Sequence, residues 1–129
     1  MPALTPPSIV RPFARYAHGV RVAGGTDLIF VSGQLGKAVD GTVPPSAEAQ
    51  AAICFANITA ILAEAEADPS HIVKLTAFVT DRAHMAGYMA ARDAWFGASP
   101  PAYASTLLIV AGFTLPEFLV EVEAIAAIP

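Results

Sequence analysis

Two acidic residues near the C-terminus have the residue type and spacing that catalysis requires. Residues 119–125 read Leu-Val-Glu-Val-Glu-Ala-Ile, so a strand would place Glu121 and Glu123 on one side and apolar residues on the other. Two carboxylates about 7 Å apart, partly buried, raise each other's pKa. Such a carboxylate can hold a substrate amine or act as general base on a water. A solvated strand face, or an ion pair with an arginine of a neighbouring subunit, would give the same pattern.

A second candidate lies where an apolar segment ends in Ser32-Gly33-Gln34. A glycine at a strand end lets a ligand approach the backbone, whose N–H groups bind carboxylates and oxyanions. An ordinary transition from strand to loop has the same sequence, so both interpretations stay open. Gly33 and Gly36 lack the Lys-Ser/Thr of a phosphate loop and the dinucleotide-binding spacing, which argues against a nucleotide site.

The histidines and the cysteine do not indicate a metal site. His18, His71 and His84 have no metal-ligand spacing with one another or with Cys54. Cys54 is the single cysteine and cannot form an internal disulfide. We therefore expect a buried structural thiol in a reducing, cytoplasmic compartment.

The composition predicts a subunit that buries apolar surface against copies of itself. Of 129 residues, 55% are hydrophobic and 14% charged, which is more apolar surface than one small domain can bury alone. The longest apolar stretch has about ten residues, whereas a membrane helix needs about 20. The net charge is −4, and the seven Lys and Arg residues are scattered. We expect a homo-oligomer that binds neither membranes nor nucleic acids.

Periodicity and turn residues predict one α+β domain over residues 1–129, with two helices on one face of a mixed β-sheet. Residues 1–13 form an extended, proline-rich lead-in. The predicted elements are a hairpin of strands 18–23 and 28–32, a loop 33–45, a helix 46–67, a strand 71–80, a helix 83–96, and strands 106–111 and 118–126. In this ββαβαββ order, both strand–helix–strand crossovers require parallel strands. The sheet face without helices is then free to pack against partner subunits.

Helix boundaries rest on local signals. Ser46 can cap the first helix, and Gly97 stops the second. In the first helix, alanine or isoleucine recurs at helical spacing, at Ala49, Ile53, Ala56, Ala60 and Ala63. One side of the second helix carries Met85, Tyr88, Met89, Arg92, Trp95 and Phe96. A guanidinium on this apolar side normally has a carboxylate partner, so we expect Arg92 to be ion-paired.

In order along the chain, these segments resemble the reactive intermediate deaminase (RidA/YjgF-like) family, also called the endoribonuclease L-PSP family. The residues Leu28–Gln34 (LIFVSGQ) are similar to the family's LFVSGQ strand end, and His71–Asp81 (HIVKLTAFVTD) to its DIVKxTVFVTD strand. Further similarity lies in Arg15–Val20, Ala49-Gln50 with Asn57 and Ile61-Leu62, Pro100–Ala102, and Leu119–Ala126. The resemblance covers nearly the whole chain.

This resemblance implies a homotrimer of chorismate mutase-like fold with three small-molecule clefts between subunits. It implies hydrolysis of reactive enamines or imines to ketoacids and ammonia, with no metal and no cofactor. Carried over position by position, Tyr16 and Gly33 line the cleft, the Ser32-Gly33 backbone assists, and Gln34 belongs to the same segment. Glu121 positions the attacking water.

The chain departs from the family just after the Pro-Pro-Ala segment, where active members carry an arginine that clamps the substrate carboxylate. Residues 103–106 read Tyr-Ala-Ser-Thr, and Ser105 falls nearest to the arginine position. We expect the Ser105 and Thr106 hydroxyls to bind a neutral or differently shaped ligand, with Arg15 as a candidate replacement for the clamp. A divergent deaminase, a non-catalytic ligand-binding or regulatory trimer, and a ribonuclease remain open; the acidic charge disfavours the last.

Overall fold

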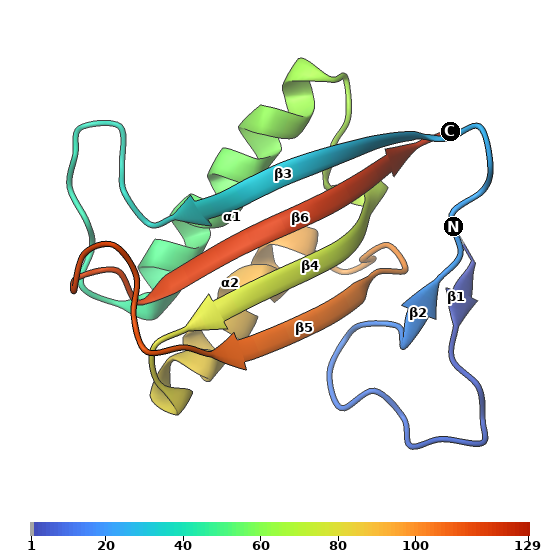
Figure 1. Cartoon of the computed structure of the whole chain (residues 1–129), viewed down its shortest axis with the longest axis horizontal. Helices are drawn as coiled ribbons and strands as arrows, with labels where there is room; N and C mark the ends of the chain where they lie inside the picture. Colours follow the sequence, from blue (N-terminus) through green and yellow to red (C-terminus); the bar gives the residue numbers. More distant parts are fainter. Residues whose placement is uncertain (1) are drawn as a thin grey trace.

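A four-stranded sheet with two helices on one face forms the body of the protein (Figure 1). In this computed structural model, which describes residues 2–129, the sheet contains β3 (Asp27–Leu35), β4 (Ile72–Val79), β5 (Ala104–Ile109) and β6 (Val120–Ile128). The helices are α1 (Ala47–Glu64) and α2 (Met85–Phe96). A separate two-stranded sheet pairs β1 (Ala3–Leu4) with β2 (Gly19–Val20). The predicted α+β architecture is confirmed.

The strand order is β3-β6-β4-β5, with β6 antiparallel to both of its neighbours and β4 parallel to β5. Because β6 separates them, β3 and β4 also run in the same direction, as the predicted crossover through α1 requires. The C-terminal strand therefore lies inside the sheet (Figure 1). Its register joins Glu121 to Leu35 on one side and to Phe78 on the other.

The predicted hairpin of residues 18–23 and 28–32 is wrong. Only Gly19–Val20 forms a strand in the first half, and it pairs with β1 of the lead-in, while β3 pairs with β6. Residues 21–25 are exposed and contribute little apolar surface. Pairing with the long strand β6, from Asp27↔Ile128 onward, buries more side chains than the short local hairpin would.

Helix α1 begins as predicted and ends three residues early, at Glu64. The Ser46 hydroxyl accepts the N–H of Ala49 at 3.1 Å, which is the expected N-cap. The alanine spacing predicted the helix, but the buried face is a different one and includes Phe55, Ile58 and Leu62. Larger side chains bury more apolar area, so they turn toward the sheet and leave most of the alanine series outside.

Helix α2 follows a 3₁₀ turn (Arg82–His84), which delays its start by two residues relative to the prediction. It ends at Gly97, whose φ of 75° favours glycine. The ring of Trp95 stacks on Phe55 of α1 with centroids 4.6 Å apart, and its Nε1 donates to the Thr59 hydroxyl at 2.8 Å. These contacts fix α2 against α1, and thereby fix the side of α2 that faces β5.

The two faces of the sheet differ in what covers them. The helices cover one face (Figure 1), and Leu75, Val120 and Val122 are fully buried beneath them. The opposite face, which we term the open face, carries Phe30, Lys74, Thr76, Phe78, Thr106, Leu108, Glu121, Glu123 and Ile125. Phe30 is 71% exposed and Leu108 46% exposed. Apolar side chains are thus free for a partner on the open face, as the composition predicted.

Candidate functional site

Glu121 lies directly against Gly33. The predicted alternation in β6 is confirmed, because Val120 and Val122 are buried, Glu121 is half-buried and Glu123 is exposed. A Cβ atom placed on Gly33 would lie 2.7 Å from Cδ and 2.8 Å from Oε2 of Glu121. Any side chain at position 33 would displace the carboxylate, so the glycine permits this close approach.

A β-bulge in β3 brings Gly33 to that position. The register between β3 and β6 shifts between Val31 and Gln34, so Ser32 and Gly33 have no partner residue in β6. Both are exposed. The Gln34 side chain donates to the Ser32 carbonyl at 3.0 Å, so Gln34 supports the bulge. Bulges commonly re-aim a strand beside functional sites.

Cys54 lies behind the bulge and is chemically quiet. The thiol is buried and donates to the Gln34 carbonyl at 3.1 Å. Burial raises its pKa to about 12, and the negative charge of Glu121 adds to the rise. A protonated thiol is neither a nucleophile nor a metal ligand. The expected buried structural thiol is confirmed.

Tyr16 and Ser105 meet at a different place, a cavity of about 200 Å³ between α2, β5 and residues 13–16. Its lining consists of Phe13, Ala14, Tyr16, Met85, Met89, Arg92, Ser105 and Leu107. The walls are mostly apolar. Two hydroxyls and one guanidinium supply its polar groups.

Arg92 also lines this cavity and is a functional candidate. The sequence did not identify it as a cavity residue. It is only 3% exposed, and its Nε donates to Asp93 Oδ1 at 3.2 Å. The expected carboxylate partner is thus confirmed. The guanidinium carbon lies 5.8 Å from the centre of the Tyr88 ring, within cation–π range. The sequence did contain one indication of this role, because Arg92 is the single charged residue on the apolar side of the second helix.

The structure places Arg15 and Thr106 apart from Ser105. Arg15 donates to the Gly97 carbonyl at 2.8 Å, at the C-terminal end of α2, where a cation is favourable. It borders a separate hollow with Pro100, Pro101 and Ala102. Thr106 accepts a hydrogen bond from Lys74 Nζ at 2.7 Å on the open face.

Glu121 and Ser105 belong to opposite faces of the sheet. Glu121 pairs with Phe78, which pairs with Leu108 on the open face. Ser105 pairs with the buried Leu75 and lines the cavity beneath α2. Strand β4 also separates β6 from β5. One chain therefore cannot bring the Glu121 carboxylate and the Ser105 hydroxyl to the same small ligand.

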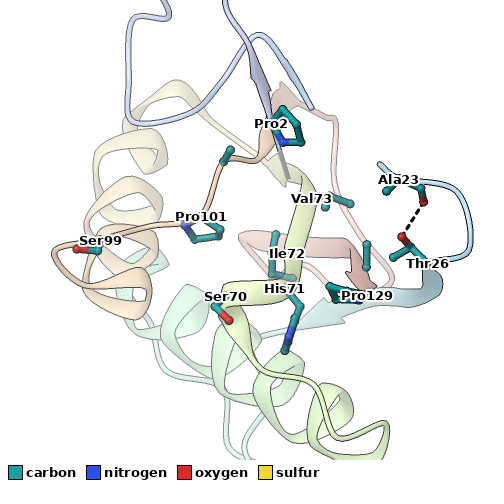
Figure 2. A pocket seen from close by; sticks show the side chains of 12 residues that line it. Pro2, Ala23, Thr26, Ser70, His71, Ile72, Val73, Ser99, Pro101 and Pro129 are labelled. Atoms are coloured by element: carbon teal, nitrogen blue, oxygen red, sulfur yellow. Dashed lines mark hydrogen bonds between the residues drawn. The ribbon is translucent and has the colours of Figure 1, made fainter. Parts of the chain in front are cut away.

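A further cavity, of about 610 Å³, lies near the chain ends (Figure 2). Prolines and small residues line much of it, and none of the predicted site residues borders it. His71 in its lining accepts the Asp68 N–H through Nδ1 at 3.0 Å, and Thr26 donates to the Ala23 carbonyl at 2.6 Å. These groups stabilise local turns. The cavity lacks an acid–base pair that would suggest catalysis.

Within residues 2–129, no group of three or more His, Cys, Asp or Glu side chains is arranged to hold a metal ion. Over the same residues, every helix is too short or too polar to cross a membrane.

Known proteins resemble this chain in sequence and in fold. The profile of the family described as Endoribonuclease L-PSP matches residues 8–128. The RutC family protein YjgH of Escherichia coli K12 is 32% identical over 120 residues, which cover 91% of this chain and 87% of YjgH. The crystal structure of YyfB from Yersinia pestis, a protein of unknown function in the conserved Rid family, aligns with a TM-score of 0.83, 25% identity and 98% coverage of both chains.

A third relative is E. coli TdcF with bound serine, which aligns with a TM-score of 0.69 and 27% identity. The alignment covers 92% of this chain and 91% of TdcF. The family assignment from the sequence motifs is thereby confirmed. The chain belongs to the RidA/YjgF family, whose profile carries the name Endoribonuclease L-PSP.

Proposed function

We propose that the protein is a cytoplasmic homotrimer that hydrolyses enamines or imines of a small nitrogen-containing metabolite in clefts between subunits. The observation that carries this proposal is the contact between the Glu121 carboxylate and Gly33. It joins a half-buried acid–base group to a bulged, exposed backbone segment. General-base catalysis and backbone recognition of a polar ligand need such a combination.

Glu121 acts on water in this proposal. Its carboxylate accepts a proton as the water oxygen forms a bond to the imine carbon, and the C=N π electrons pass to nitrogen. The protonated Glu121 gives its proton to that nitrogen and completes the aminoalcohol; the hydroxyl proton then passes through Glu121 to the amine, the C–N bond breaks, and ammonia leaves as the ketone forms and the carboxylate is restored. A positioned general base contributes about 10²–10⁴-fold to such a step.

The separation of the site residues supports a cleft between subunits. Glu121 with Gly33 and Tyr16 with Ser105 lie on opposite faces of the sheet. Both sets can contact one ligand if the open face of one subunit meets the β5 edge of the next. The exposed Phe30 and Leu108 supply apolar surface for that contact. The bound serine of TdcF supports a small polar ligand in this fold.

Ammonia release from freshly generated imines of varied amino acids tests the proposal. Glu121→Gln should lower the rate at least about 10²-fold, because the general base is lost. Glu123→Gln is the matched control: it lies two residues away on the same face, is exposed, and should retain the rate. If wild type and Glu121→Gln both match the buffer rate for every imine, the hydrolase proposal fails.

A non-catalytic ligand-binding trimer is the second candidate. The absence of an arginine in residues 103–106 favours it, and so does the engagement of Arg15 with Gly97. In that case ligand binding persists in the complete absence of turnover. The net charge of −4 disfavours a ribonuclease. RNA cleavage that disappears in Glu121→Gln would instead favour a ribonuclease over the other two functions.

A further inference from the structure

Two guanidiniums and one carboxylate lie at and beside the cavity at α2, and Arg92 is the one of them that lines it. Asp93 Oδ1 lies 3.2 Å from Arg92 Nε and 4.0 Å from Arg15 Nη1, so two guanidiniums share one carboxylate. Among the described residues that line the cavity, none is acidic. Of the three guanidinium nitrogens of Arg92, Nε is the one that donates to this carboxylate. A buried, incompletely paired charge is unfavourable unless another group compensates it.

Two tyrosine hydroxyls near Arg92 are also unpaired. The hydroxyls of Tyr88 and Tyr103 are buried and have no hydrogen-bond partner in the described part of the chain. Burial raises the pKa of both groups, and the positive charge of Arg92 opposes the rise in each. Buried polar groups are nearly always satisfied in folded proteins. Two unsatisfied hydroxyls beside a buried guanidinium indicate that a ligand or ordered water completes this region.

The cavity also defines what kind of ligand fits. Phe13, Met85, Met89 and Leu107 provide apolar walls, while Arg92, Ser105 and Tyr16 provide hydrogen-bond donors. A planar guanidinium matches the two oxygens of a carboxylate. Methionine side chains adapt to varied apolar shapes. The lining therefore suits a small molecule with a carboxylate at one end and an aliphatic body at the other.

We propose that Arg92 is the anion-binding residue of this protein and that the cavity at α2 binds the carboxylate of a small aliphatic acid. This deepens the proposed function, because it names the residue that takes the role left vacant in residues 103–106. The identification of the bound acid as the substrate rests on the proposed function, whereas the binding of an acid at Arg92 does not. A carboxylate of a second protein copy could occupy the same position, and the test separates these sources.

The test measures equilibrium binding of 4-methylpentanoate and its uncharged amide, 4-methylpentanamide, to the full-length protein by isothermal titration calorimetry. The acid should bind at least about tenfold more tightly than the amide, because only the acid has a charge for Arg92. Arg92→Met, which preserves apolar volume, should lose at least about tenfold in affinity for the acid. Arg92→Lys should fall between, since it retains the charge without the paired donors.

Arg82→Met is the matched control, because it removes one exposed positive charge from the turn before α2 and should leave affinity unchanged. Equal affinities for acid and amide, or no binding of either at millimolar concentration, would overturn the proposal; this comparison needs no variant to fold. So would loss of binding in Arg15→Met with full binding in Arg92→Met. Dissociation of Arg92→Met oligomers without acid binding by wild type would instead identify a partner carboxylate as the occupant.

The two proposals can fail separately. Binding of the inert acid requires no turnover, and Glu121→Gln should retain it. If wild type releases no ammonia from any imine yet binds the acid through Arg92, the hydrolase proposal fails and the anion site stands. If ammonia release depends on Glu121 while Arg92→Met retains full affinity for the acid, the anion-site proposal fails and the hydrolase proposal stands.

Discussion

Two buried polar side chains, Gln50 and Arg92, have opposite relations to their surroundings. Gln50 is fully buried, and its Nε2 donates to the carbonyls of Pro44 and Glu117, each at 2.9 Å. Its Oε1 accepts the Leu119 N–H at 2.8 Å. Arg92 is almost as deeply buried, and its Nε donates to the carboxylate of the adjacent Asp93. The tyrosine hydroxyls beside it have no partner among residues 2–129.

The difference separates a structural centre from a candidate binding centre. Gln50 joins the loop before α1 to the turn before β6, and this fixes where β6 begins and where Glu121 lies. A satisfied network of this kind rigidifies a fold. Around Arg92, two buried hydroxyls lack partners in the described part of the chain, beside a cavity that a ligand can enter. The predictions below test this contrast, from the largest expected effect to the smallest.

Gln50→Leu should destabilise the protein most. It leaves two carbonyls and one N–H, in partly buried hydrogen bonds, without their partner, at about 1–3 kcal/mol for each group. We expect a loss of roughly 4 kcal/mol in the free energy of unfolding, measured by urea denaturation at fixed protein concentration. A loss below about 1 kcal/mol would show that water replaces the glutamine, and Gln50 would then be no structural centre.

Gly36→Ala should also destabilise the protein, because Gly36 packs against Gln50. A Cβ at position 36 would lie 2.4 Å from Cβ and 2.6 Å from Cα of Gln50, so the backbone of α1 would have to move. Overpacking of this kind costs about 1–3 kcal/mol. Gly24→Ala is the control, because open space surrounds that position and its φ is not in the left-handed region. Equal unfolding midpoints for the two variants would refute the close packing at Gly36.

Alkaline pH should destabilise the protein through its buried weak acids. The pKa of Cys54 is raised from 9.0 to about 12, and the pKa values of Tyr88 and Tyr103 are also raised. Above pH 9 the unfolded thiol loses its proton while the folded one keeps it, so stability is full below pH 9 and falls as pH rises toward 12. Each such group contributes a slope of up to about 1.4 kcal/mol per pH unit. Cys54→Ala should reduce the measured slope; an unchanged slope would contradict the buried, protonated thiol.

Tyr88→Phe should have the smallest effect and the opposite sign to Gln50→Leu. Removing a buried hydroxyl that has no partner relieves its desolvation, so the ligand-free protein should be unchanged or more stable by up to about 1 kcal/mol. Thermal and urea unfolding of wild type and variant measure this. A loss above about 2 kcal/mol would mean that the hydroxyl is satisfied in solution, and the contrast with Gln50 would disappear.

Local sequence patterns correctly predicted those features whose position depends on neighbouring residues in the chain. The alternation around Glu121, the N-cap at Ser46 and the stop at Gly97 all specify their own positions. The hairpin at residues 18–32 was wrong because β6, far away in the sequence, offers β3 a longer register. The buried face of α1 differed from the alanine series because side-chain size decides which face packs.

The candidate site was predictable only in parts. Gly33 and Glu121 lie on adjacent strands and meet as the motifs implied. The cavity at α2 depends on contacts among residues 13–16, α2 and β5, which no single segment reveals. Arg15 was a reasonable candidate by its position beside Tyr16, but its contact with Gly97 depends on where α2 ends. Arg92 appeared in the sequence only as a charge that needed a partner.

Activity of mixed oligomers tests most directly whether Glu121 of one protomer and Arg92 of its neighbour share a cleft. Two inactive variants, Glu121→Gln and Arg92→Met, are unfolded together, refolded as one pool and assayed for ammonia release. In a ring with sites between protomers, about one site in four would combine both intact residues, so about a quarter of wild-type activity should return. Activity no higher than the average of the two separately refolded variants would contradict a site shared between protomers.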